Sequence, residues 1–555
     1  SKRNRRGGGM PAVEAMLVRL RYFPVFLLTG FTGFDGKEGC VSFLLILSSA
    51  PMATTEQEHR LLCISPVDGR YANKCTDLNH IFSEFGLIRQ RVRVEVEWLT
   101  LMSDRSEFPE VPGLTSEQRA KLSAIASGLT VADGLRVKEI ERTTNHDVKA
   151  VEYLIKEKLH STGDPTLAKL TEFTHFACTS EDINNLSYAL MFTEAREKVL
   201  RSRFISLIDK LAELSQEYAD TPLLALTHGQ PATPTTFGKE CAVFVHRLKR
   251  QLKNLERVEV MGKFNGATAN YNAHIIAYPD VDWFEVSRTL VEDHLGLNWQ
   301  PVSTQIENHD YVSEMCDTVA RMNTIVIDLC RDFWIICGKI VILSTWERTL
   351  RESLSLSRPM MELRYIMRGV LGLRTIAGEV GSSTMPHKVN PIDFENAEGN
   401  CGVAISMLHH FSTKLPISRM QRDLTDSTVQ RAVGSAFAHT IIAIDSTIKG
   451  LSKVMVSGPV ANRELEEHWA VTGEAVQTLM RRYGLERPYE RLKEFTRGRE
   501  IDATSMREFT ENIAREIGED KPGVKGLENL TPQTYIGLAP VIARKYGTPV
   551  AEEKE

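Results

Sequence analysis

Apolar residues recur at every third or fourth position over most of the chain after residue 52, clearly so in residues 81–88 and 312–335. Because an α-helix repeats every 3.6 residues, this spacing places apolar side chains on one helix face. Alternation typical of strands is scarce, and Asn265-Gly266, the one Asn-Gly dipeptide, has neighbours typical of a loop. Long helices separated by short polar breaks predict an all-α fold built on a helical bundle.

The first fifty residues do not follow this pattern. They hold seven Lys and Arg against three Asp and Glu, with short apolar stretches at 23–28 and 41–47. A basic, acid-poor composition is typical of targeting segments, but arginines and glycines interrupt any helical stripe here. Non-native upstream sequence, a targeting leader and a folded element remain as interpretations. We expect residues 1–51 to be a basic and apolar leader outside the fold.

The composition excludes several classes of protein. Of 555 residues, 42% are apolar and 25% charged, as in ordinary globular proteins. The 67 Lys and Arg against 72 Asp and Glu give a net charge of −5, which does not suggest nucleic-acid binding. No apolar run approaches the roughly 20 residues that cross a bilayer, so we expect no membrane partner. Nine scattered cysteines without a Cys-x-x-Cys pair favour a reducing compartment. We expect a cytoplasmic protein, with an organellar leader as the less favoured alternative.

One polar segment interrupts the helical pattern more sharply than the rest. Residues 381–391 read GSSTMPHKVNP, with two prolines that exclude a helix. Hydroxyl groups, backbone amides and a lysine in one loop suit binding of a carboxylate or a developing oxyanion. A surface turn joining two helices is the alternative for an arbitrary polar loop.

This loop resembles the signature of the fumarase/aspartase superfamily, whose pattern is Ser-Ser-x-Met-Pro-x-Lys-x-Asn. With further polar segments in the same order, the chain resembles the bacterial-type branch of the adenylosuccinate lyase family, from about Ser65 to about Val541. These segments are SPVDGRY at 65–71, RTTNHD at 142–147, TSEDIN at 179–184, THGQPATP at 227–234, TQIE at 304–307 and QRDLTDS at 421–427.

The resemblance implies a carbon–nitrogen lyase of purine nucleotide biosynthesis. It would eliminate fumarate from adenylosuccinate, giving AMP, and from the succinylated aminoimidazole carboxamide ribotide (SAICAR), giving AICAR. Such an elimination removes a proton beside a carboxylate and protonates the departing nitrogen. The resemblance assigns His228 as general acid and Ser382 as general base, with Lys388 and backbone amides stabilising the alkoxide. Without the resemblance, His228 could equally be a structural histidine, and Ser382 could equally be a turn residue.

The resemblance also implies two sets of substrate-binding residues. The first would hold the succinyl carboxylates and comprises Thr179, Ser180, Ser383, Lys388 and Asn390. Thr179 and Ser180 also fit capping of a helix N-terminus.

The second set would hold the phosphate and comprises Arg70, Tyr71, Arg422, Ser427 and Arg431. Ser427 and Arg431 are one helical turn apart and share a face, and Arg422 should approach from the preceding bend. A guanidinium suits a phosphate dianion, although many exposed arginines on a helix surface contact only solvent.

The remaining positions carried over from the family are Asn145, His146, Asp147, Gln305 and Asn396. Of these, we expect His146 to support the phosphate or the acid. The chain has no His-x-x-x-His spacing, and His409 and His410 are adjacent and face apart, so we expect no metal site. The elimination needs no redox cofactor, and we expect none.

The resemblance implies three helical domains and a homotetramer whose active sites each draw on three subunits. About 30 extra residues precede the signature loop, and they put the position of Ser382 in doubt if they are native. The expected domains are residues 52–168 at the N-terminus, 169–451 as the central bundle with an insertion at about 341–371, and 452–555 at the C-terminus.

Two rival functions are weaker. One is a sister lyase acting on argininosuccinate, aspartate or malate; these substrates carry no phosphate for the second binding set. The other is a catalytically inactive structural protein on the same fold, which would have no need for both His228 and Ser382.

Overall fold

The computed structural model describes residues 56–337, 370–374 and 389–552. The leader at 1–51, residues 341–369 of the expected insertion, and Ser382, Ser383 and Lys388 lie outside these ranges. The chain divides into two compact units, residues 1–63 and 64–555. In the first unit the described residues form α1 (Glu56–Leu62), whose side chains are largely exposed.

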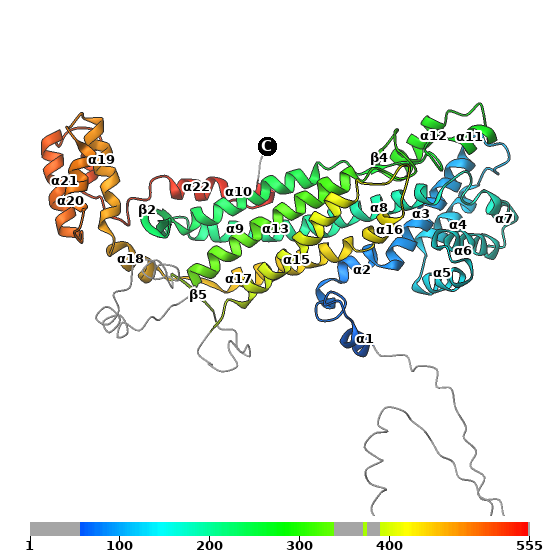
Figure 1. Ribbon diagram of the computed structural model, residues 1–555, viewed down its shortest axis with the longest axis horizontal. Coiled ribbons are helices and arrows are strands. Elements are labelled where there is room, and N and C mark those ends of the chain that lie inside the picture. The colour runs from blue at the N-terminus through cyan, green and yellow to red at the C-terminus, as the bar shows by residue number, and fades with distance from the viewer. Residues whose placement is uncertain (1–55, 338–369, 375–388, 553–555) are drawn as a thin grey trace, which may run out of the picture. The chain divides into compact units, whose positions relative to one another are not determined.

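The described part of the second unit is mainly helical, which confirms the predicted all-α class (Figure 1). The helices before the central bundle are α2 (Thr76–Phe82), α3 (Glu84–Asp104), α4 (Ser116–Ser127), α5 (Val131–Thr144), α6 (Asp147–Ser161) and α7 (Pro165–Lys169). The long helices of the bundle are α8 (Ser180–Ala195), α9 (Arg201–Glu217), α10 (Phe237–Glu256), α13 (Asp310–Cys337), α15 (Ile392–Lys414) and α17 (Val433–Lys453). Shorter helices are α11 (Asn272–Ala277), α12 (Trp283–Thr289) and α16 (Thr425–Gln430).

The helices that follow α17 are short. They are α18 (Gly458–Glu466), α19 (Gly473–Arg482), α20 (Pro488–Thr496), α21 (Ala503–Ile517) and α22 (Ala539–Tyr546). Three two-stranded sheets accompany the described helices. They pair β1 (Pro222–Thr227) with β2 (Gln230–Thr236), β3 (Met261–Gly262) with β4 (Asn298–Trp299), and β5 (Leu371–Leu373) with β6 (Val454–Val456).

The apolar spacing predicted α13 well and α2–α3 only in part. The 312–335 pattern lies inside α13. The 81–88 pattern spans two helices, because Ser83 adopts an extended conformation and its Oγ accepts a hydrogen bond from the Gly86 N–H at 3.1 Å. A serine in that position satisfies a backbone donor that a new helix would otherwise leave unpaired, so α3 begins there.

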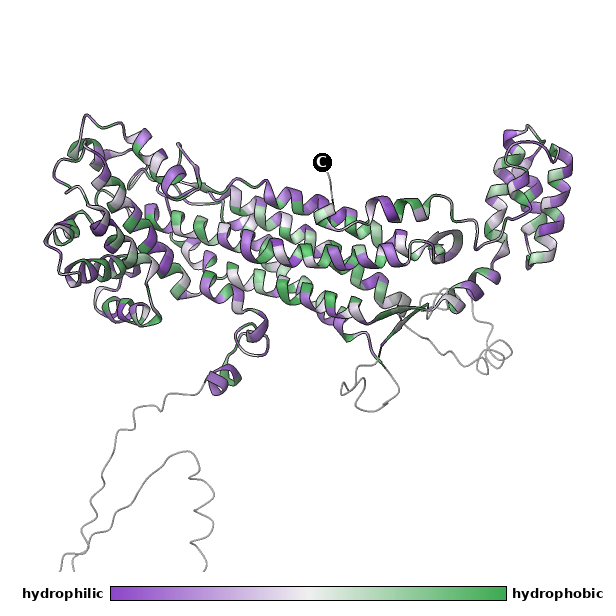
Figure 2. Ribbon diagram, turned by 180° about the vertical axis from the view of Figure 1, so that it is seen from behind, coloured by the Kyte–Doolittle hydropathy of each residue, from purple (hydrophilic) through white to green (hydrophobic). Residues whose placement is uncertain are grey.

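Two hydrophobic cores are present in the described residues. One extends from Val67 to Ala461 and joins the helices before the bundle to the bundle itself. The other is smaller and lies among α19, α21 and their neighbours, where Trp469, Met480 and Ile513 are buried. Hydrophobic and hydrophilic positions are interspersed along the long helices in Figure 2, as expected where a helix buries one face, whereas α8 is buried at every position from 181 to 192.

The last helix, α22, packs against the bundle instead of the smaller core. The Ser215 hydroxyl and the Gln216 amide of α9 donate hydrogen bonds to the Ala543 carbonyl at 3.3 and 3.1 Å. Beyond the segments that form the smaller core, the C-terminal part of the chain therefore returns to the bundle and contacts α9.

The β1–β2 hairpin was not predicted, and it carries His228. Its strands are antiparallel, with Thr227 opposite Gln230, so His228 and Gly229 form a two-residue turn. Both have positive φ, 55° and 71°, the combination that matches the twist of a tight hairpin.

Candidate active site

The N-terminus of α8 holds the first predicted binding residues. Thr179 is its N-cap, and its backbone N–H donates to Asp182 Oδ2 at 2.8 Å. The capping interpretation is therefore correct for Thr179, with Asp182 as the partner. Thr179 and Ser180 are half-buried at a helix start, where unpaired N–H groups and the helix dipole favour a bound anion.

Arg422 and Gln305 meet beside this helix start. Arg422 lies in the bend before α16, as expected, and its Nη2 donates to Glu181 Oε1 at 2.8 Å. Its Nη1 donates to Gln305 Oε1 at 3.2 Å, and the Gln305 amide donates to the Ala267 carbonyl at 2.8 Å. Gln305 and Arg422, two of the predicted binding residues, are thus in direct contact, and other groups of the same chain hold both side chains in place.

Asp147 and Arg431 form a second group, linked to the first through buried side chains. Asn184 Nδ2 donates to Glu181 Oε1 at 2.7 Å, and Asn184 Oδ1 accepts from Arg91 Nε at 2.9 Å. Arg91 then donates to Asp147 Oδ2 at 2.8 Å, and Arg431 donates to the same oxygen at 2.7 Å.

This chain of contacts runs without interruption from Arg422 to Arg431. Arg91 is its innermost member, with a side chain only 2% exposed. Burial would raise the pKa of Asp147, but the charge and hydrogen bond of Arg91 and the charge of Arg431 lower it to about 2. Asp147 is therefore a fixed negative charge that orients two guanidinium groups.

Arg431 occupies the C-cap of α16, one turn after Ser427, as the spacing predicted. Its Nη1 also donates to Glu84 Oε2 at 2.7 Å. Its side chain remains 38% exposed, which leaves part of the guanidinium open to a ligand.

Tyr71 and Asn396 form a third group. The Asn396 amide donates to the Tyr71 hydroxyl at 3.0 Å, and Asn396 Oδ1 accepts from the Ser446 hydroxyl at 2.8 Å. The Arg70 guanidinium lies 5.8 Å from the Tyr71 ring centre. Burial acts to raise the pKa of Tyr71, but the hydrogen bonds from Asn396 and Arg70 outweigh it and lower that pKa.

Asn145 and His146 connect α5 to α6. Asn145 caps α5 in the left-handed conformation, with φ of 51°, and His146 caps α6 through its Nδ1, which accepts from the Lys149 N–H at 3.2 Å. Both are exposed. Of the remaining binding residues, Asn390 is half-buried just before α15.

His228 is exposed at the tip of the β1–β2 hairpin, far from the α8 N-terminus of the same chain. Residues 180–217 form one continuous helical run, which spans about 55 Å at 1.5 Å per residue. The eleven residues from Tyr218 to His228 can return no more than about 40 Å of that length. Figure 1 accordingly shows β2 and α16 at opposite ends of the bundle.

Two buried ion pairs near this site were not singled out from the sequence. His175 Nδ1 lies 2.6 Å from Glu95 Oε1; burial alone would lower the pKa of His175, but the hydrogen bond and charge of Glu95 raise it. Lys263 Nζ lies 2.8 Å from Asp182 Oδ1, with both side chains fully buried. Asp182 lies within the 179–184 motif but was given no role there, His175 lies four residues before that motif, and Lys263 had no signal in the sequence.

Within the described ranges, no group of three or more His, Cys, Asp or Glu side chains could hold a metal ion. None of the helices that the structure describes is long and apolar enough to span a membrane.

Two family models match the chain. One is described as a lyase and matches residues 69–348 and 337–406, two segments that overlap where the insertion was expected. The other, described as the adenylosuccinate lyase C-terminal domain, matches residues 418–536. Together these ranges contain every predicted site residue.

Solved structures show the same fold at low sequence identity. A fumarate lyase from Mesorhizobium sp. BNC1 superposes with a TM-score of 0.60 at 17% identity, covering 85% of this chain and 97% of that one. A 3-carboxy-cis,cis-muconate lactonizing enzyme from Pseudomonas putida gives 0.57 at 20% identity, covering 85% and 96%.

Curated relatives are much more similar in sequence. The adenylosuccinate lyase of Vibrio cholerae is 50% identical over 479 residues, which is 86% of this chain and 97% of that protein. The adenylosuccinate lyase of Escherichia coli strain K12 is 49% identical over the same shares of both chains. The chain therefore belongs to the adenylosuccinate lyase family.

Proposed function

We propose that this protein eliminates fumarate from adenylosuccinate, giving AMP, and from SAICAR, giving AICAR. The observation that carries the proposal is the 50% identity to the Vibrio cholerae adenylosuccinate lyase over 97% of its length. At that level of similarity a different substrate class would require a rebuilt site, and the signature residues are present in the sequence. We expect the protein to act in the cytoplasm.

The proposed chemistry divides between two residues. His228 protonates the departing nitrogen, and Ser382 removes the proton from the carbon beside the carboxylate. The negative charge that develops on that carboxylate needs donors that are already in place. Ser383, Lys388, Asn390, Thr179 and Ser180 are the proposed donors, and the half-buried start of α8 supports the last two.

The phosphate end is proposed to rest on Arg70, Tyr71, Arg422, Ser427 and Arg431. What supports this is the way two of the arginines are held: Arg422 by Glu181 and Gln305, and Arg431 by Glu84 and Asp147. A guanidinium fixed by a carboxylate loses less side-chain freedom when it binds an anion. The remaining carried-over residues, Asn145, His146, Asp147, Gln305 and Asn396, are proposed to complete the substrate pocket.

We propose further that the active protein is a homotetramer whose sites each draw on three chains. The separation between His228 and the α8 N-terminus within one chain supports this. The helical run of residues 180–217 is about 15 Å longer than the greatest reach of residues 218–228, and β2 and α16 lie at opposite ends of the bundle in Figure 1. This placement favours a site in which His228 of one chain meets the α8 start of another.

The test is an ultraviolet assay of the purified full chain with adenylosuccinate, following release of fumarate and AMP. The proposal predicts turnover with equal amounts of both products. A folded tetramer that releases neither would contradict it. Loss of activity on dilution that does not follow tetramer dissociation would contradict the shared site alone.

A further inference from the structure

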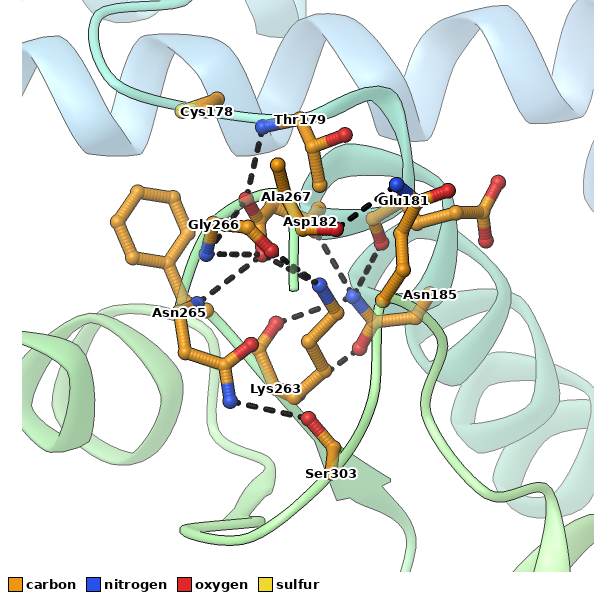
Figure 3. Close-up of polar contacts among 12 residues, drawn as sticks. Cys178, Thr179, Glu181, Asp182, Asn185, Lys263, Asn265, Gly266, Ala267 and Ser303 are labelled. Atoms are coloured by element: carbon orange, nitrogen blue, oxygen red, sulfur yellow. Dashed lines mark hydrogen bonds and ion pairs between the residues drawn. The ribbon is translucent and has the colours of Figure 1, made fainter. Parts of the chain in front are cut away.

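Asp182 accepts more hydrogen bonds than any other carboxylate in the described part of the bundle. Neither the catalytic nor the binding proposal gives it a role. It is fully buried in α8, one turn inside the helix start. Figure 3 shows it at the centre of contacts from two segments that are distant in sequence, the α8 start and residues 263–267.

The contacts of Asp182 account for both of its oxygens. Oδ1 accepts from Lys263 Nζ at 2.8 Å and from the Asn265 N–H at 3.0 Å. Oδ2 accepts from the Thr179 N–H at 2.8 Å and from the Gly266 N–H at 3.2 Å. The carboxylate thus accepts from three backbone N–H groups and one buried ammonium, and these contacts offset the cost of burying it.

Asn185 fixes the same segment from the next turn of α8. Its Oδ1 accepts from the Lys263 N–H at 2.8 Å, and its Nδ2 donates to the Lys263 carbonyl at 3.0 Å. Gly266 has φ of +84°, so the chain reverses there in a conformation that a side chain would strain. Contacts from α8 therefore hold the segment at residues 263, 265 and 266, and Gly266 allows the chain to reverse there.

This segment in turn contacts residues 303–305, which include Gln305. The Asn265 amide donates to the Ser303 hydroxyl at 3.0 Å, and the Ala267 carbonyl accepts from the Gln305 amide at 2.8 Å. The other end of the Gln305 side chain accepts from Arg422. A displacement of residues 265–267 would therefore move Gln305, which is one of the two side chains that hold Arg422.

We propose that Asp182 is a positioning residue for substrate binding: its buried carboxylate locks the N-terminus of α8 and the 265–267 segment together and so aims Thr179 and Gln305. This inference rests on the proposed function, in which Thr179 and Gln305 bind substrate. Lys263 supplies the charge that allows the carboxylate to remain buried.

The first test compares Asp182→Asn with Glu194→Gln in the full chain. Glu194 is the control, because it is another hydrogen-bonded carboxylate on the same helix; it accepts from the side chains of Arg89, Gln90 and Lys198. We expect Asp182→Asn to raise KM and to lower kcat/KM for adenylosuccinate by about 10- to 100-fold, since misplaced binding groups lose much of their effect. Glu194→Gln should stay within about twofold of the parent.

The second measurement is hydrogen exchange of the backbone amides at 179, 265 and 266. Faster exchange at these positions in Asp182→Asn, and not in Glu194→Gln, supports the proposal without reference to activity. If the parent itself shows no turnover, the proposed function fails, and the exchange result still decides the positioning role of Asp182.

A double variant separates positioning from general stability. Asp182→Asn in a Gln305→Ala background should cost a smaller factor than in the parent, because Asp182 acts through Gln305. Full multiplication of the two losses would overturn the inference. So would parental KM and exchange in a folded Asp182→Asn protein.

If Asp182→Asn does not fold, the expected cause is Lys263, whose buried ammonium has lost its counter-charge. Asp182→Asn with Lys263→Met removes that cause, and the same three measurements apply to it. Failure of this variant to fold, while Glu194→Gln folds, would overturn the positioning role in favour of a purely structural one.

Discussion

Asp147 accepts a hydrogen bond from each of two arginines, and this contact makes its ionisation a source of stability. The pKa of its carboxyl is about 2 in the folded chain, whereas an unfolded aspartate titrates near 4. The contribution is therefore complete above pH 4 and is lost as the pH falls through 2. Because the side chain is 27% exposed, we expect about 1–2 kcal/mol after solvent screening.

Asp147→Asn should accordingly lower the free energy of unfolding by about 1–2 kcal/mol at pH 7. The difference from the parent should shrink as the pH approaches 2, as measured by urea unfolding at several pH values. Asp310→Asn is the control, since Asp310 is also the first residue of a helix but is exposed. A deficit that is the same at pH 7 and pH 3 would show that lost charge is not its cause.

His228 should be required for turnover and not for folding. His228→Asn is preferable to alanine, because asparagine tolerates the positive φ of 55° at this position but cannot act as a general acid. We expect kcat to fall by about 100- to 10,000-fold, the usual contribution of a general acid, with an unchanged thermal midpoint. His160→Ala, at another exposed histidine, should leave kcat unaltered. Near-parental turnover in His228→Asn would remove it from the mechanism.

At the level of elements, the β1–β2 hairpin is the scaffold that presents His228. Gly229 has φ of +71° and open space around it, so Gly229→Ala adds backbone strain and no clash. Gly163 has φ of +68° with equally open space in the loop after α6, which makes Gly163→Ala a matched control. Each change should cost about 1 kcal/mol of stability.

The two glycine variants should differ in activity. Gly229→Ala alters the turn that aims the imidazole, and we expect kcat to fall by about tenfold through misplacement of the acid. Gly163→Ala should keep parental kcat. Equal activity of the two variants in a steady-state assay would mean that the hairpin turn does not set the position of His228.

The helices could be predicted where burial follows a single stripe, as in α13. They could not be delimited where one polar residue starts a new helix, as Ser83 does before α3. The hairpin was missed for a similar reason. Its turn is His-Gly instead of Asn-Gly, and Pro231 and Pro234 interrupt β2, which a two-stranded sheet tolerates because its outer edge needs no partner.

The site residues could be identified from motifs, but their contacts could not. Glu181 and Arg422 are 241 positions apart, and Asp147 and Arg431 are 284 apart. Periodicity reports only which neighbours share a face, so pairings over such separations depend on how the whole bundle folds. The pairing of Asp182 with Lys263 could not be predicted for the same reason.

At the scale of the whole molecule, the C-terminal segment is anchored by α22 on α9. A side chain at Gly547 would collide with the Ser215 side chain, whereas Gly526 has open space. Gly547→Ala should therefore destabilise the protein by about 1–3 kcal/mol through overpacking, and Gly526→Ala much less. Thermal unfolding of the two variants measures the difference; equal midpoints would mean that α22 contributes little to the stability of the bundle.

The central claim is that one active site is built from residues of different chains. It is tested by producing His228→Asn and Arg422→Met chains together, each with its own tag, and isolating tetramers that contain both. Each variant alone should be nearly inactive towards adenylosuccinate. Mixed tetramers should recover about a quarter of the parental fumarate release, because that fraction of sites receives both intact residues by chance. Mixed tetramers no more active than the two variants measured separately would contradict the claim.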